Sequence, residues 1–69
     1  PTMYALERTL ALNPDHFGAL RGLGAVFDQI GDPARAYDAY DKALSIRPFD
    51  KDVEEARDRL VAHSRGTTL

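Results

Sequence analysis

The segment from residue 20 to residue 48 constrains the fold of this chain more than any other stretch. Before a central Gly31-Asp32-Pro33 break, small and large apolar residues recur at the spacing of one helical face, at Leu20, Leu23, Gly24 and Phe27. After the break this spacing returns at Ala36, Tyr40, Ala43 and Leu44. Gly31 can adopt the left-handed conformation that ends a helix, Asp32 can cap the next helix, and Pro33 fits its first turn. The segment is therefore predicted to form two antiparallel helices.

These two helices are expected to pack closely because each stripe contains small residues. Gly24 on the first helix, with Ala36 and Ala43 on the second, lets the two backbones approach. The seam is expected to be filled by the larger apolar residues Leu20, Leu23, Phe27, Tyr40 and Leu44. Gly24 is therefore predicted to lie against the following helix.

The same segment resembles the tetratricopeptide repeat (TPR), a helix–turn–helix unit of about 34 residues. The resemblance rests on Leu20, Leu23, Gly24, Phe27, Ala36, Tyr40 and Pro48, with Leu20 in place of the usual Trp and Phe27 in place of the usual Tyr. It implies an all-α fold built from antiparallel helical hairpins of an α-α superhelix, with residues 17–50 as one full repeat. The signature indicates an architecture and a mode of action, and it does not name a partner.

Partial repeats are predicted on both sides of this full one. Residues 1–14 are expected to be the second helix of a preceding repeat, because Leu6, Leu10, Leu12 and Pro14 precede Tyr40, Leu44, Ile46 and Pro48 by 34 positions. Residues 51–63 are expected to be a capping helix, because a shift by 34 positions puts Glu54, Arg57 and Asp58 where Leu20, Leu23 and Gly24 stand. Terminal repeats need a solvated outer face, so the array is predicted to end at this helix.

Four helices are thus predicted, near residues 2–12, 16–30, 33–46 and 51–63. The expected caps of the last three are Asp15, Asp32 and Asp50. Residues 64–69 lack helical periodicity and are expected to form a disordered tail.

The composition favours a soluble helical domain and argues against several classes of function. The 69 residues are 43% hydrophobic and 29% charged, and no apolar run is long enough to span a membrane. The net charge is −2 and the basic residues alternate with acidic ones, which argues against nucleic-acid binding. The chain contains no cysteine and is compatible with any redox compartment, although we favour a cytoplasmic over a periplasmic location.

Catalysis is not expected from this sequence. The two histidines, His16 and His63, lie at opposite ends of the chain, and no spacing typical of metal ligands or of a nucleophile is repeated. The carboxylates fall on predicted solvent faces, where they are more typical of solvated charge than of acid–base pairs. We therefore expect no enzyme activity, no metal site and no cofactor, with surface or capping roles for both histidines.

The resemblance implies a binding function, because the first helices of successive TPR repeats line a concave groove that receives a peptide or a partner helix. By that analogy the groove-facing residues are Gly18, Arg21, Gly22, Ala25, Asp28 and Gln29, joined by Asp52, Glu55 and Arg59 on the last helix. The carboxylate-clamp chaperone binders pair a basic residue with an asparagine four positions later, whereas Ala25 follows Arg21 here. This departure argues against recognition of chaperone tails. The expected partner is a protein or peptide of unspecified sequence.

A structural role is the alternative, in which these helices pack against a second copy of the chain or another domain of the parent protein. The first helix resembles the second half of a repeat, so part of its apolar face, formed by Met3, Leu6 and Leu10, is expected to lack a partner helix. A single core below about 70–80 residues rarely supplies more than about 3–5 kcal/mol of stability. A homodimer formed through this face is therefore predicted.

Overall fold

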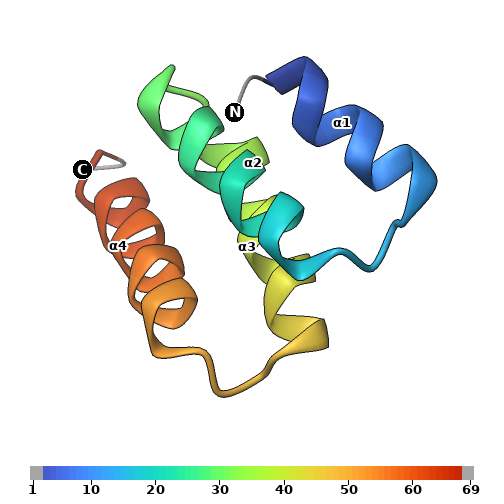
Figure 1. The fold of residues 1–69 in the computed structure, drawn as a ribbon. Helices are drawn as coiled ribbons and strands as arrows, with labels where there is room; N and C mark the ends of the chain where they lie inside the picture. Colours follow the sequence, from blue (N-terminus) through green and yellow to red (C-terminus); the bar gives the residue numbers. More distant parts are fainter. Residues whose placement is uncertain (1–2, 68–69) are drawn as a thin grey trace.

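The computed structural model describes the backbone of residues 3–67 and the side chains as far as residue 62. Within that range the chain forms four helices and no strand, namely α1 (Met3–Leu12), α2 (Phe17–Gln29), α3 (Pro33–Ile46) and α4 (Lys51–Thr67). Successive helices run antiparallel, so that α2 and α4 point in the same direction (Figure 1). The predicted all-α fold of helical hairpins is confirmed.

A histidine caps the start of α2. The Nδ1 atom of His16 accepts a hydrogen bond from the backbone N–H of Ala19 at 3.0 Å. The prediction that Asp15 caps this helix is wrong, because α2 begins at Phe17 and Asp15 lies one residue before the cap. The backbone N–H of Asp15 instead donates to the Asn13 side chain at 3.3 Å. Of the surface or capping roles expected for His16, the capping role is the one observed.

The turn between α2 and α3 follows the predicted chemistry. Gly31 has a φ of +81°, the left-handed conformation that side chains disfavour. Its N–H donates to the Asp28 carbonyl at 3.3 Å, and the N–H of Asp32 donates to the Phe27 carbonyl at 2.9 Å. These two bonds define a Schellman motif and satisfy the last carbonyls of α2. Asp32 then caps α3, because its side chain accepts from the Arg35 N–H at 3.3 Å.

The fourth helix begins as predicted but ends later. The Asp50 side chain accepts a hydrogen bond from the Val53 N–H at 3.1 Å, which confirms Asp50 as its cap. The backbone remains helical to Thr67, whereas the sequence predicts an end near residue 63 and a disordered tail from residue 64. Each residue added to an existing helix gains a backbone hydrogen bond, so a helix can continue past the end of its apolar stripe. Residues 1–2 and 68–69 of the predicted segments lie outside the described part.

The core consists of two clusters that meet on the α2–α3 hairpin. One cluster joins α2, α3 and α4 through Leu20, Ala36, Tyr40, Ala43, Leu44, Val53, Ala56 and Leu60. The other joins α1 to α2 and α3 through Leu6, Ala19, Leu23 and Ala39. Of the predicted seam residues, Phe27 is half-buried and the other four are buried.

Helices α2 and α3 approach each other closely at Gly24. A Cβ atom built on this glycine would lie 2.6 Å from Cε1 of Tyr40, closer than real Cβ contacts come. Tyr40 is itself only 6% exposed, so its ring has little room to move away. The prediction that Gly24 lies against the following helix is confirmed.

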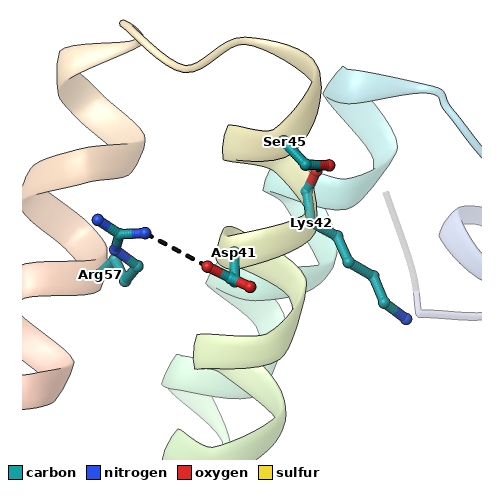
Figure 2. Close-up of polar contacts among 4 residues, drawn as sticks. All are labelled: Asp41, Lys42, Ser45 and Arg57. Carbon is teal, nitrogen blue, oxygen red and sulfur yellow. Dashed lines mark hydrogen bonds and ion pairs between the residues drawn. The ribbon is translucent and has the colours of Figure 1, made fainter.

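An ion pair connects α3 to α4 on their outer side (Figure 2). The Nη1 atom of Arg57 lies 3.3 Å from Oδ1 of Asp41, and the Arg57 side chain is about one third exposed. Figure 2 shows Lys42, the residue after Asp41, pointing away from α4. Lys42 instead lies 3.5 Å from the Asp38 carboxylate one turn earlier on α3.

Candidate functional site

A hollow of about 350 Å³ lies between α2 and α4, with α3 at its floor. We refer to it as the α2–α4 hollow. Its walls are formed by residues of the two parallel helices and its floor by one residue of α3, together Arg21, Gly22, Ala25, Tyr40, Asp52, Val53, Ala56 and Arg59. The hollow exists because Ala25 and Ala56 are too small to fill the space between the helices.

Tyr40 brings a polar group to the floor of this hollow. Burial raises the pKa of the Tyr40 hydroxyl above its ordinary value, and the nearby Asp28 carboxylate also raises this pKa. The guanidinium groups of Arg59 and Arg21 act in the opposite direction, which places both cations near the same hydroxyl. The hydroxyl therefore keeps its proton at neutral pH and can donate a hydrogen bond.

The two arginines of the hollow are not paired with acidic side chains in the described part of the chain. Other cations are engaged, since Arg35, Lys42 and Arg57 each lie within 3.5 Å of an aspartate. Arg21 and Arg59 are exposed and make no such ion pair among the described residues. Glu55 lies one turn before Arg59 and does not bridge it either. Both guanidinium groups are thus accessible to a ligand.

The structure brings together some of the residues predicted to face a groove and not others. Five of them line the hollow, namely Arg21, Gly22, Ala25, Asp52 and Arg59. Asp28 stands near the Tyr40 hydroxyl, while Gln29 and Glu55 are exposed and do not line the hollow. Gly18 lines a different hollow of about 590 Å³, together with Asp15, His16, Phe17, Arg21, Ile46 and Arg47.

Three further lining residues were not predicted from the sequence. Tyr40, Val53 and Ala56 belong to apolar helical stripes and were assigned to the core alone. Apolar spacing in a sequence does not reveal that one edge of a buried side chain borders a hollow filled with solvent. For Tyr40 the available signal was its residue type, because a buried tyrosine usually brings its hydroxyl to a polar or wet surface.

The predicted self-association face on α1 is partly used inside the chain. Leu6 is buried, and a Cβ on Gly22 would lie 3.0 Å from its Cδ2 atom. Leu6 therefore belongs to the α1–α2 core and is not available to another molecule, whereas Met3 and Leu10 are half-buried. The exposed apolar side chains of α1 are Tyr4, 71% exposed, and Leu12, 81% exposed.

Among the described side chains, no three of His, Asp and Glu come together in a way that could hold a metal ion. None of the helices in residues 3–67 combines the length and apolar character that a membrane crossing requires.

The architecture defines a helical-repeat unit, in which hairpins stack side by side and the first helices of successive pairs run parallel. Over 54 residues the chain is 33% identical to a TPR repeat-containing protein of Rhizobium etli, a match that covers 78% of this chain and 26% of that protein. No family model and no solved structure matches the chain. The match and the four helices together confirm the resemblance to the tetratricopeptide-repeat family, and the chain forms a TPR-like unit. It spans about a quarter of the length of this curated relative.

Proposed function

We propose that this chain is a protein-interaction module that binds a peptide or a segment of a partner protein in the α2–α4 hollow. The observation that carries the proposal is the convergence of three helices on a hollow with two unpaired arginines and a tyrosine at its floor. Helical-repeat proteins use their concave surfaces for binding, and here the parallel helices α2 and α4 flank the hollow. The hollow contains no histidine, serine or cysteine among its lining residues, which favours binding over catalysis.

The proposal includes a position for α4 at the end of a repeat array. Arg57 occupies the place equivalent to Leu23, and it pairs with Asp41 instead of offering an apolar side chain to a further helix. Asp58, at the place equivalent to Gly24, is exposed. A charged outer face of this kind suits a terminal helix, because it remains stable in contact with water.

Filling the hollow is expected to abolish binding without unfolding the protein. Ala25 is exposed and lines the hollow, so the indole of Ala25→Trp would occupy the space that a peptide needs. For a partner first recovered by affinity capture and then purified, we expect affinity to fall about tenfold or more, a loss of about 1.4 kcal/mol or more. Isothermal titration calorimetry would measure this loss.

Ala34→Trp is the matched control, because Ala34 is exposed on α3 and does not line the hollow. It should leave the affinity unchanged, and both variants should keep the helical circular dichroism of the wild type. Equal binding by the Ala25→Trp variant and the wild type would contradict a binding site in the hollow.

Self-assembly is a second candidate function, favoured by the uncovered side of α1. Positions 34 residues apart allow a direct comparison of α1 with α3. Leu44 is 7% exposed, while its equivalent Leu10 is half-buried. Ile46 is half-buried, while its equivalent Leu12 is 81% exposed. Within the described residues, α1 therefore lacks a covering helix on the side where α3 has one.

A homodimer is accordingly expected at micromolar and higher concentrations, with a melting temperature that rises with concentration. Leu12→Glu should shift the dimer to monomer, because it places a charge on the uncovered side of α1 without touching the core. Phe49→Glu is the control, since Phe49 is 89% exposed in the α3–α4 loop and should not affect the dimer. Sedimentation equilibrium would measure both, and a wild type that remains monomeric and folded at low micromolar concentration would refute this candidate.

A further inference from the structure

We propose that His16 is an acid-sensitive cap of α2, and that protonation of its imidazole releases the start of this helix. Only the neutral side chain can make the hydrogen bond that caps α2, and the surroundings of the ring disfavour its charged form. This property belongs to the fold itself and does not depend on binding in the α2–α4 hollow.

The first argument is the direction of the capping hydrogen bond. The backbone N–H of Ala19 donates to Nδ1 of His16 at 3.0 Å. The first N–H groups of a helix have no partner within the helix, and a cap satisfies one of them. A neutral imidazole has one nitrogen that accepts and one that donates, whereas both nitrogens donate in the charged form. Protonation of Nδ1 would therefore set two donors against each other and end the cap.

The second argument is the position of the ring against the first turn of α2. A Cβ atom built on Gly18 would lie 3.3 Å from Cε1 and 3.6 Å from Nδ1 of His16, so the imidazole packs on the backbone of this turn. The N-terminus of a helix carries a partial positive charge, which disfavours a cation there. Loss of the cap and repulsion by the helix dipole thus act in the same direction when the ring becomes charged.

The third argument is the set of charged groups beside the ring. His16 borders the hollow of about 590 Å³ whose charged lining residues are Asp15, Arg21 and Arg47. Arg47, at the end of α3, has its guanidinium carbon 4.7 Å from the centroid of the Phe17 ring, which holds this cation beside the start of α2. The two arginines disfavour another positive charge, whereas the Asp15 carboxylate favours one. The two cations together exceed the single carboxylate.

Uncapping is expected to loosen the first turn of α2 without unfolding the domain. Ala19 and Leu20 are 3% and 6% exposed, so the helix stays anchored in the core from its third residue. The charge of a histidine ordinarily changes between about pH 8 and about pH 5. The unfolded chain has no cap to lose when it takes up this proton. The free energy of unfolding should therefore fall as the pH falls through this range.

Thermal denaturation at about pH 8 and about pH 5 would test the cap in the wild type, His16→Asn and His16→Ala, all at one protein concentration. Asparagine caps helices well and does not titrate, whereas alanine cannot cap. The wild type should melt close to His16→Asn at the higher pH and close to His16→Ala at the lower pH. Relative to His16→Asn, its melting temperature should fall by about 4–8 °C, as expected for loss of one cap in a domain of this size.

His63→Asn is the matched control, because His63 is the other histidine of the chain. This variant should keep the full wild-type decrease in melting temperature. Carboxylates that begin to titrate near the lower pH are common to all four proteins, so the comparison with His16→Asn removes their contribution. At the higher pH, correlation of the imidazole ¹H and ¹⁵N resonances should show a proton on Nε2 of His16 and none on Nδ1.

Three results would overturn the inference. A wild type that follows His16→Asn at both values of pH would show that protonation does not end the cap. A decrease that disappears in His63→Asn would belong to the other histidine. A proton on Nδ1 of His16 at the higher pH would mean that this atom does not accept from Ala19.

Discussion

Replacing Gly24 with leucine is expected to destabilise the fold by about 1–3 kcal/mol, because the new side chain would overpack the α2–α3 seam. Even a single added Cβ would lie 2.6 Å from the buried ring of Tyr40. Leucine is a better helix former than glycine by about 0.8 kcal/mol, and the steric cost must exceed that gain. In a domain of this size each kcal/mol lowers the melting temperature by about 4–8 °C. Thermal denaturation followed by circular dichroism would measure the shift.

Ala25→Leu is the matched control for this substitution. It introduces the same side chain one residue later on the same helix, at an exposed position. Its effect should remain within about 0.5 kcal/mol of zero, as for most surface substitutions. A Gly24→Leu variant more stable than the wild type would mean that Gly24 does not face Tyr40.

Replacing Tyr40 with alanine should have the largest effect of any single change considered. Large-to-alanine substitutions of buried aromatic residues typically cost about 3–5 kcal/mol. A core of this size rarely supplies more than about 3–5 kcal/mol of net stability, so the variant is expected to be largely unfolded at room temperature. Loss of helical circular dichroism and of dispersed amide resonances would be the observation.

Tyr40→Phe separates the ring from the hydroxyl. The ring fills the space beside Gly24, whereas the hydroxyl lies near the charged groups of the hollow. Since this hydroxyl makes no hydrogen bond within the described chain, Tyr40→Phe should retain the fold and nearly all of its stability. A well-folded Tyr40→Ala variant would show that the ring does not hold α2, α3 and α4 together.

The helices and their caps were largely predictable because they depend on local chemistry. Apolar spacing identified the α2–α3 hairpin, and a glycine followed by aspartate and proline identified the turn. The cap of α2 was misassigned because Asp15 and His16 are neighbours and both carry an acceptor. The residue that accepts a hydrogen bond from the Ala19 N–H is decided by where α2 begins. The helix begins at Phe17, one residue later than predicted, so His16 is the cap.

The site was less predictable because it depends on how the helices are placed relative to one another. Repeat analogy identified Arg21, Ala25 and Arg59 as groove residues, and they do line one hollow. It did not identify Tyr40. Apolar spacing shows which side of a helix is buried, but it does not show that the edge of the Tyr40 ring reaches the hollow. In the same way the stripe on α1 predicted an apolar face, but not that Leu6 packs against Gly22 within the chain.

Each helix makes its main contacts with the helix before or after it in the chain, and the α2–α3 pair is the most extensive. Folding therefore needs only short loops to close, which carries a small entropic cost. Proteins dominated by such local contacts fold within microseconds to milliseconds. The α2–α3 hairpin can form first, and α1 and α4 can then add to its two sides independently. A destabilising substitution in α1 would consequently leave the addition of α4 to the α2–α3 hairpin unchanged.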